Sequence, residues 1–255
     1  MTRVREQAAA RAAATGGFGP PVVHAEVDAL VSEFLPGRTL TEADLCAACA
    51  GASTSTPSLL TLVVQTLRTM HSTPVPPELL AAAKPGWLPA DVHGWLALAE
   101  EKGFSRLPLV NDARALIASL EEAAGPTAAA VAFCHFDPLP DNFVRDGERV
   151  WLIDYEYAAA GQPWMDLAIL SMGCELTAEA EEKLLAAYLQ QDDIDVATRS
   201  RFAALKLLAC LRETCWGIVA EVSGTSALSL EEAVAYTDKN YAKFEATRRA
   251  FFGAP

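Results

Sequence analysis

The sequence predicts an α+β fold in which helices predominate and a few short strands gather in one stretch of the chain. Long segments such as residues 57–71 carry apolar residues three and four positions apart, a spacing typical of amphipathic helices. The apolar runs 130–133, 142–144 and 150–153 are too short for helices and predict strands. The dipeptide Asp146-Gly147, between the last two runs, is a strong hairpin-turn signal, so we expect an antiparallel pair there.

Local signals predict the other elements in chain order. Residues 3–15 are rich in alanine and end at two glycines, which predicts a helix closed by a glycine cap. The runs 22–25 and 29–34 predict a strand pair, and Thr41 followed by Asp44 predicts a capping box that opens a helix. Five prolines between residues 73 and 89 predict a loop. Helices are expected over residues 57–71, 90–102, 110–124, 164–173, 177–190, 195–222 and 228–250.

Charge and hydropathy limit the classes of partner. The formal net charge of −13 at pH 7 argues against nucleic acid and anionic lipid, because these partners need basic surfaces. We attribute the charge mainly to a solvated acidic surface, and it is compatible with a cationic small molecule. No apolar run approaches the ~20 residues of a membrane span, so we expect no membrane span and a cytoplasmic location. Cys46 and Cys49 form a lone C-x-x-C, which we interpret as small buried residues in a reducing compartment rather than a zinc site.

The stretch between residues 134 and 170 carries the candidate chemistry. His135, Asp137 and Asn142 have the spacing H-x-D-x-x-x-x-N, and Asp154 follows an apolar run. Transfer of a phosphoryl group from a nucleotide needs a carboxylate that orients the attacking hydroxyl and oxygen ligands that hold magnesium. Asp137 is the candidate base, and Asn142 and Asp154 are the candidate Mg²⁺ ligands.

His135 belongs to the candidate catalytic set, although we expect its imidazole to hydrogen-bond backbone and to hold the shape of the loop. The alternative interpretation is that Asp137 and its neighbours are ordinary loop carboxylates, since Asp and Asn are common in turns. The joint pattern is far rarer than the short motif. It combines a strand, the motif, a hairpin, a second strand, the letters I-D-Y-E-Y and a later D-L-A. This combination favours phosphotransfer chemistry.

The same stretch resembles the catalytic core of the aminoglycoside phosphotransferase and choline kinase superfamily, which is related to protein kinases. The I-D-Y-E-Y and W-M-D-L-A segments are most similar to the choline/ethanolamine kinase branch. Residues 30–40 resemble the family's hinge, residues 67–72 the family's L-R-x-L-H helix end, and residues 211–217 a late helix that lines the acceptor pocket.

The resemblance implies a protein-kinase-like fold with a truncated N-terminal lobe and a mainly helical C-terminal lobe that carries the catalytic β-hairpins. Residues 1–37 would be the remnant of the nucleotide-binding lobe with its hinge. Residues 38–255 would be the helical lobe with the catalytic loop and the acceptor pocket.

The cofactors implied by the resemblance are ATP and Mg²⁺. Glu33, Phe34 and Leu35 lie where the family's hinge binds adenine through its backbone. Glu6 matches a glutamate that pairs with a phosphate-contacting lysine in the family, yet the first lysine of this chain is Lys84. We therefore expect the strands that carry the phosphate loop and that lysine to be missing from these residues.

The acceptor implied by the resemblance is a small cationic amino alcohol. Aromatic faces and carboxylates hold quaternary ammonium groups, and the candidates are Trp216, Tyr155, Glu156 and Glu213. The alternative for each aromatic residue is core packing. Phe136 departs from the family, in which Asn is common at this position, and we expect its ring to reshape the pocket floor.

Three functional hypotheses remain open from the sequence. The first is a kinase for choline or ethanolamine. The second is a catalytically impaired kinase-like binding protein, or a truncated fragment, because the phosphate-gripping strands are not visible. The third keeps the chemistry and changes the acceptor to an aminoglycoside, thiamine or homoserine, since one scaffold can host many acceptors. The oligomeric state is not predicted.

Overall fold

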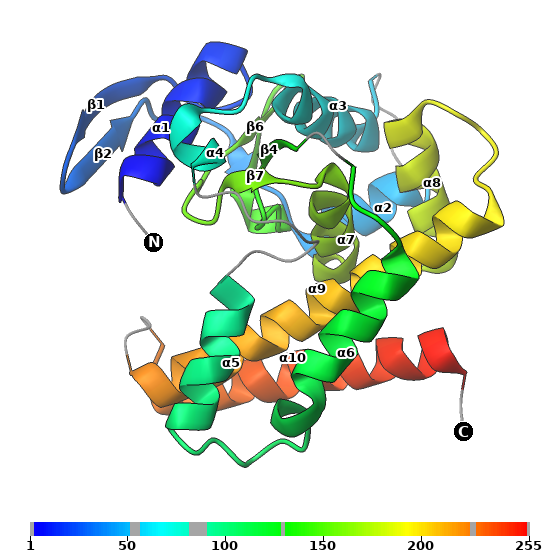
Figure 1. Ribbon diagram of the computed structural model, residues 1–255. Helices are drawn as coiled ribbons and strands as arrows, with labels where there is room; N and C mark the ends of the chain where they lie inside the picture. The colour runs from blue at the N-terminus through cyan, green and yellow to red at the C-terminus, as the bar shows by residue number, and fades with distance from the viewer. Residues whose placement is uncertain (1–2, 52–56, 82–90, 129–130, 225–227, 254–255) are drawn as a thin grey trace. The chain divides into compact units, whose positions relative to one another are not determined.

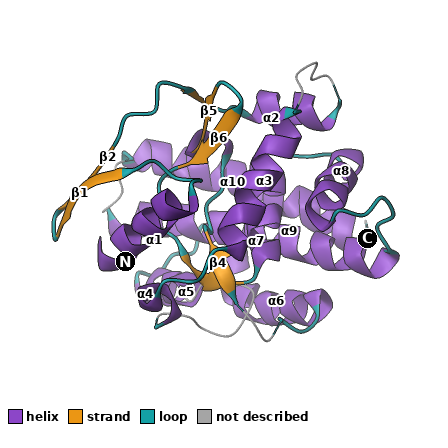
Figure 2. Cartoon of the chain, turned by 90° about the horizontal axis from the view of Figure 1, so that it is seen from above, coloured by secondary structure: helices purple, strands orange, loops and turns teal. Residues whose placement is uncertain are grey.

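The computed structural model describes residues 3–51, 57–81, 91–128, 131–224 and 228–253, which form two compact units. The first unit comprises Met1–Pro85 and Ala128–Asp195, and the second comprises Gly86–Thr127 and Val196–Pro255 (Figure 1). Every strand that the structure describes belongs to the first unit (Figure 2). The described part of the second unit is helical, so the predicted α+β class, with helices predominating, is confirmed.

The first unit begins with a helix and a two-stranded ribbon. Helix α1 spans Arg3–Gly16 and is followed by Gly17 at a positive φ of 75°, as the glycine pair predicted. Strands β1 (Val22–Glu26) and β2 (Ala29–Ser32) pair antiparallel. The predicted second strand ran to residue 34, but β2 ends two residues earlier. Prolines 20 and 21 precede the partner strand, and they offer no N–H group with which to extend the ladder.

A short strand, β3 (Arg38–Thr39), pairs with β5, and helix α2 (Glu42–Cys49) follows. The predicted capping box is confirmed, because Thr41 and Asp44 satisfy each other's backbone N–H groups at the start of α2. Of the C-x-x-C pair, Cys49 is buried as expected, whereas Cys46 is exposed and its Sγ donates to the carbonyl of Cys174. The expectation that Cys46 is buried was wrong, because its position faces solvent on α2.

Helix α3 (Leu59–Ser72) is confirmed within two residues, and most of its apolar stripe is buried. The predicted loop of residues 73–89 is wrong in part, because residues Pro77–Leu80 form the short helix α4. Prolines at 76 and 77 explain this, since proline is favoured at the first position of a helix, where no N–H is needed. Residues 82–89 of the predicted loop lie outside the described part of the chain.

The predicted hairpin is present as β5 (Phe143–Asp146) and β6 (Arg149–Leu152), and Gly147 in its turn has a φ of 60°. Strand β4 (Ala132–Cys134) pairs with β7 (Ala159–Gly161), a strand too short and too poor in β-branched residues to predict. Residue 130 of the predicted strand lies outside the described residues. The hairpin was expected to begin at Asn142, but this residue ends the 3₁₀ turn η1 (Pro140–Asn142), whose first position is a proline.

Two helices complete the first unit. Helix α7 (Pro163–Gly173) is buried along most of its length and packs against β4, so it forms the centre of this unit's core. Helix α8 (Ala178–Leu189) packs against α3, and Gln190 closes it in a left-handed conformation. Both helices agree with their predicted ranges to within about a residue at each end.

The second unit consists of α5 (Asp91–Glu101), α6 (Leu109–Ala124), α9 (Val196–Ser223) and α10 (Leu230–Phe252). Helix α10 lies along α9, and α5 and α6 also pack on α9 (Figure 1). Arg106, between α5 and α6, binds Glu221 at 2.7 Å and also pairs with Asp238 on α10.

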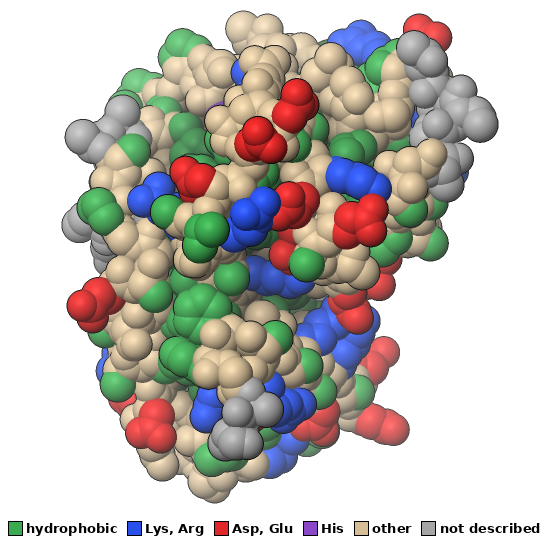
Figure 3. All heavy atoms as spheres, turned by 90° about the vertical axis from the view of Figure 1, so that its right-hand side faces the viewer, with side chains coloured by type: hydrophobic (Ala, Val, Ile, Leu, Met, Phe, Trp, Pro, Cys, Tyr) green, Lys and Arg blue, Asp and Glu red, His purple; other side chains and the backbone are tan. Residues whose placement is uncertain are grey.

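Acidic and basic side chains are interspersed on the face drawn in Figure 3. None of the helices in the described ranges combines the length and hydropathy needed to cross a membrane.

Candidate active site

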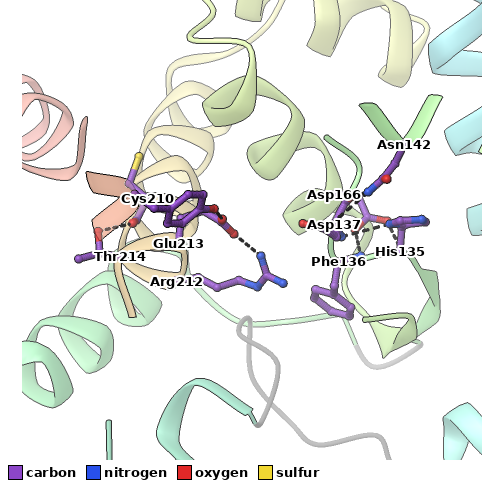
Figure 4. Close-up of polar contacts among 10 residues, drawn as sticks. His135, Phe136, Asp137, Asn142, Asp166, Cys210, Arg212, Glu213 and Thr214 are labelled. Atoms are coloured by element: carbon purple, nitrogen blue, oxygen red, sulfur yellow. Dashed lines mark hydrogen bonds and ion pairs between the residues drawn. The ribbon is translucent and has the colours of Figure 1, made fainter. Parts of the chain in front are cut away.

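Residues 134–142, called the catalytic loop after the predicted role of Asp137, run from the last residue of β4 to the start of β5. They bring Asp137 and Asn142 into direct contact (Figure 4). The side-chain Nδ2 of Asn142 donates to the backbone carbonyl of Asp137 at 2.7 Å and to its carboxylate Oδ2 at 3.1 Å. These two bonds fix the orientation of both side chains. They also direct the Oδ1 atom of Asn142 away from Asp137, where it can serve as an oxygen ligand.

His135 is bonded to backbone at both ring nitrogens. Its Nδ1 accepts the N–H of Asp137 at 3.2 Å, and its Nε2 lies 2.9 Å from the carbonyl of Ile153. Since Nδ1 accepts, the proton belongs on Nε2, which donates to Ile153. The imidazole is buried and lies against the ring of Tyr155, with centroids 5.2 Å apart. It therefore links the catalytic loop to the residue that precedes Asp154.

Asp166 on α7 binds the backbone of the same loop. Its carboxylate is fully buried and accepts the backbone N–H groups of His135 at 2.8 Å and Phe136 at 2.7 Å. It also lies 2.9 Å from Nε2 of His71 on α3. Sequence reasoning used Asp166 and His71 only as parts of similar segments and assigned neither a role. Both residues belong to segments that the sequence had singled out, D-L-A and L-R-T-M-H, but nothing in the sequence indicated that the two side chains are in contact.

Cys134 lies beside this pair, and its Sγ, the His71 ring nitrogen and an Asp166 oxygen are within 4.8 Å of one another. Burial raises the pKa of the Cys134 thiol well above its usual value, and the neighbouring Asp166 charge adds to the effect. The thiol is therefore neutral and behaves as a small apolar residue. The oxygen and nitrogen atoms of Asp166 and His71 are already used in hydrogen bonds.

Phe136 has a positive φ of 60°, which is unusual for a bulky residue. Its ring is 3% exposed and lies over Gly161 of β7, where an added Cβ would be 2.3 Å from the Phe136 Cζ. The absence of a side chain at position 161 thus leaves room for the ring. The ring is packed in the first unit's core rather than presented as an open surface.

Asp154 lies two residues after the end of β6 and has a φ of 62°. The carbonyl of Asn142 accepts the N–H of Ile153 at 2.9 Å, so Asn142 and Asp154 are held on adjacent backbone segments. The side chain of Asp154 is exposed. A carboxylate and a carboxamide oxygen in this position form a donor set that suits Mg²⁺, which prefers hard oxygen ligands.

The expected cofactor residues converge on one cavity of about 520 Å³ in the first unit. Its lining includes Glu6 of α1, residues Glu33, Phe34 and Leu35 that follow β2, and Asp154. Glu6 forms an ion pair with Arg3 at 2.8 Å. The structure therefore brings together the four residues predicted to bind the nucleotide and one predicted metal ligand.

Two of the expected acceptor residues lie in the first unit. Tyr155 is buried, and its hydroxyl donates to the carbonyl of Leu152 at 2.8 Å. Burial also raises the pKa of Tyr155 well above its usual value, so the hydroxyl remains protonated. Glu156, the next residue, is exposed. The two neighbouring residues therefore differ in their exposure to solvent. Tyr155 also lines the cavity of about 520 Å³.

The other two expected acceptor residues, Glu213 and Trp216, lie on α9 in the second unit. The Glu213 carboxylate pairs with the buried guanidinium of Arg212 (Figure 4). It also accepts a hydrogen bond of 2.6 Å from the hydroxyl of Tyr236. The rings of Trp216 and Tyr236 meet edge to face, with centroids 4.9 Å apart. Arg212 and Tyr236 were not predicted. Arg212 adjoins Glu213 in the sequence, whereas Tyr236 comes from another helix.

Comparisons with known proteins bear on the family and the fold of the chain. The model of the phosphotransferase enzyme family (APH) matches residues 3–205. Protein LicA of Haemophilus influenzae is 34% identical over 58 residues, which are 23% of this chain and 22% of LicA. The matched segment thus spans about a fifth of that relative.

Solved structures extend the likeness over nearly the whole chain. A choline/ethanolamine kinase family protein from Mesorhizobium loti is 25% identical, with a TM-score of 0.76 over 98% of this chain and 81% of that chain. In a separate structural comparison, the crystal structure of LicA in complex with AMP is 20% identical, with a TM-score of 0.66 over 96% of this chain and 79% of that chain. The predicted kinase-like fold is therefore confirmed, and the chain belongs to the phosphotransferase enzyme family.

Proposed function

We propose that this phosphotransferase transfers the terminal phosphoryl group of ATP to the hydroxyl of a small cationic amino alcohol, choline or ethanolamine. The observation that carries the proposal is the contact between Asn142 and Asp137, which fixes the carboxylate of the proposed base and directs the Oδ1 atom of Asn142, the proposed metal ligand, away from it. Phosphoryl transfer depends mostly on such positioning and on charge stabilisation.

Asp137 is proposed to orient the acceptor hydroxyl and to take its proton. The Asn142 amide fixes the rotamer of the carboxylate, and His135 fixes the backbone N–H of Asp137. The ordering of these groups is therefore achieved on folding rather than at each turnover. This arrangement lowers the entropic part of the barrier.

Glu33, Phe34 and Leu35 are proposed to hold the adenine in the cavity that Asp154 also lines. Asn142 and Asp154 would hold Mg²⁺, because both offer oxygen atoms on adjacent backbone segments. When bound, the ion would neutralise phosphate charge. The AMP in the LicA structure supports an adenine nucleotide as the cofactor.

The cationic acceptor is supported by the similarity to the choline/ethanolamine kinase family protein. Within the second unit, Trp216 and Glu213 stay candidates for holding an ammonium group. Because Arg212 compensates the charge of Glu213, an aromatic ring face would supply most of the attraction there. Tyr155 is proposed as a further acceptor-side residue because its ring contacts His135 of the loop. Glu156 is proposed because the residue is exposed.

The test is phosphate-ester formation followed by ³¹P NMR, with Mg-ATP and choline, ethanolamine, an aminoglycoside, thiamine or homoserine. Asp137→Asn should lower kcat by about 10²–10⁴-fold if Asp137 acts as the base. Asp141→Asn is the matched control, because Asp141 is an exposed carboxylate of the same loop, and it should leave kcat near the wild-type value.

Three results would contradict the proposal in different ways. Ester formation only with a non-cationic acceptor would overturn the acceptor class. Equal rates for Asp137→Asn and Asp141→Asn would overturn the role of Asp137. Failure of every acceptor in the presence of bound Mg-ATP would overturn the activity itself.

A further inference from the structure

Tyr188, near the end of α8, is joined to the catalytic loop through two side chains. Its hydroxyl lies 2.8 Å from Nδ1 of His71, and Nε2 of His71 lies 2.9 Å from Oδ2 of Asp166. Asp166 in turn accepts the backbone N–H groups of His135 and Phe136. A hydrogen-bonded chain thus runs from an outer helix to the backbone that directly precedes the candidate base.

The phenol of Tyr188 is held in place from α3. The guanidinium of Arg68 lies 5.8 Å from the centre of the Tyr188 ring and also binds the Tyr188 carbonyl. The His71 ring meets the Tyr188 ring edge to face, with centroids 5.7 Å apart. These contacts leave the hydroxyl little freedom to turn away from His71.

The direction of the hydrogen bonds follows from the groups present. Burial raises the pKa of Tyr188, so its hydroxyl is protonated and can donate to Nδ1 of His71. Nε2 then carries the imidazole proton and donates it to the buried carboxylate of Asp166. The opposite tautomer would place a lone pair of Nε2 against that carboxylate, and the side chain of His71 is only 4% exposed to water.

We propose that Tyr188 is a positioning residue for phosphoryl transfer, which fixes the Nε2–H tautomer of His71 and so keeps Asp166 aligned on the catalytic loop. The inference rests on the proposed function, because the loop it positions carries Asp137. It adds a residue on α8 that touches neither nucleotide cavity nor candidate base.

The loop needs this restraint because Phe136 is held at a positive φ. Such a conformation costs on the order of 1–3 kcal/mol and persists only where the surroundings impose it. The bond from Phe136 N–H to Asp166 is the restraint next to Asp137. If Asp166 turns, the loop can relax, and a shift of about 1 Å at the base is enough to slow a reaction strongly.

The first test is kinetic. Tyr188→Phe removes only the hydroxyl and should lower kcat on the order of 10-fold, with the KM for ATP unchanged because the cavity residues are not touched. Tyr241→Phe on α10 is the matched control, since Tyr241 stacks on Phe244 in the second unit, and it should leave kcat unchanged. A wild-type kcat for Tyr188→Phe would overturn the proposal.

A second variant separates the tautomer from general packing. His71→Gln supplies an N–H group to Asp166 without any tautomer to fix. Adding Tyr188→Phe to His71→Gln should therefore change kcat less than about 2-fold, although the same change costs about 10-fold in the wild-type background. Equal losses in both backgrounds would show that the Tyr188 hydroxyl acts independently of His71, which would overturn the proposal.

NMR tests the positioning role of Tyr188 even if the proposed acceptor is not the substrate. The chain has four histidines, so the ring ¹⁵N signals of His71 can be assigned by single substitutions. Wild-type His71 should show a protonated Nε2, and Tyr188→Phe should move the amide protons of His135 and Phe136 upfield. A protonated Nδ1 in wild type, or unchanged amide shifts in the variant, would refute the positioning role independently of turnover.

Discussion

Phe136 and Asp154 both have left-handed backbone conformations, at φ values of 60° and 62°, and both belong to the candidate site. Residues other than glycine adopt this region at a cost, and they keep it where neighbours impose it. For Phe136 the neighbours are the Asp166 carboxylate and the bare backbone of Gly161. The loop geometry at Asp137 therefore depends on a residue that carries no side chain.

Gly161→Ala tests this dependence. The new Cβ would lie 2.3 Å from the Phe136 Cζ, so the ring must move. We expect a loss of about 1–3 kcal/mol in the free energy of unfolding and a clear fall in kcat, measured by chemical denaturation and by the transfer assay.

Gly94→Ala is the control for that substitution. Gly94 lies inside α5, and a Cβ added there would meet nothing within 4 Å, so alanine should stabilise the helix by about 0.5–1 kcal/mol. Gly161→Ala with unchanged stability and kcat would show that the Phe136 ring is not confined by β7.

At the scale of elements, the join between β3 and α2 is held by one carboxylate. Asp44 receives two bonds of 2.7 Å from the guanidinium of Arg38 and one of 2.8 Å from the backbone N–H of Thr41. Gly37 precedes β3, where an added Cβ would lie 2.1 Å from the carbonyl oxygen of Arg145. The chain thus passes from the hinge residues into the helix along a closely restrained path.

The Arg38 guanidinium, through its hydrogen bonds, holds the pKa of the Asp44 carboxyl well below its usual range. A carboxyl with a lowered folded-state pKa stabilises the fold above the unfolded-state value of about 3.9, and this stabilisation is lost as pH falls toward the folded-state pKa. Asp44→Asn should therefore cost about 0.5–1 kcal/mol at pH 7, and the difference from wild type should shrink below about pH 4.

Urea unfolding curves across that pH range measure the effect. Asp193→Asn makes the same chemical change at an exposed position after α8, and its difference from wild type should stay near zero throughout. A cost for Asp44→Asn that is constant down to about pH 3 would contradict the assigned ion pair.

At the scale of the whole molecule, the six cysteines are unpaired among themselves and differ mainly in burial. Burial raises the pKa of Cys49 and Cys210 to about 11 and that of Cys215 to about 12, so their thiolates are scarce at neutral pH. Cys46 is exposed. We therefore expect the six thiols to differ widely in their rates of reaction with electrophiles.

Alkylation with iodoacetamide at about pH 8, followed by peptide mass spectrometry, should modify Cys46 well before the buried cysteines. Cys46→Ser should remove the fast phase and leave the slow ones. A fast phase that persists in Cys46→Ser would mean that a buried thiol becomes exposed in solution.

Prediction from the sequence succeeded where the signal was local. Helix bounds and the two-strand hairpin depend on spacing, caps and turn residues, so their positions were predicted to within two residues. The elements β3, β7 and α4 are too short to show a pattern. The place of Asn142 in a 3₁₀ turn depends on Pro140, a single residue whose effect was outweighed by the apolar run after it.

The chemistry of the candidate site stays a prediction from the sequence, and the side chains that hold its loop in place were not predicted. Asp137, Asn142 and Asp154 have a recognisable spacing, and the structure gathers the hinge residues and Asp154 around one cavity. The contact of Asp166 with His71 joins positions far apart in the chain, and the pairing of Arg212 with Glu213 uses the charge that had been assigned to an acceptor. Such partners come from tertiary packing, which spacing in one sequence does not encode.

The three hydrogen bonds to the Asp166 carboxylate, from His71 and from the backbone of His135 and Phe136, determine whether the motif can be transferred to another protein. The loop that carries H-x-D-x-x-x-x-N takes its shape from a residue on α7 and another on α3, both outside the motif. Grafting residues 134–142 onto a new scaffold would transfer the motif without the side chains that fix the conformation of its loop. The smallest transferable part is the loop together with Asp166, His71 and Gly161, four separate pieces of chain that must be reproduced in register.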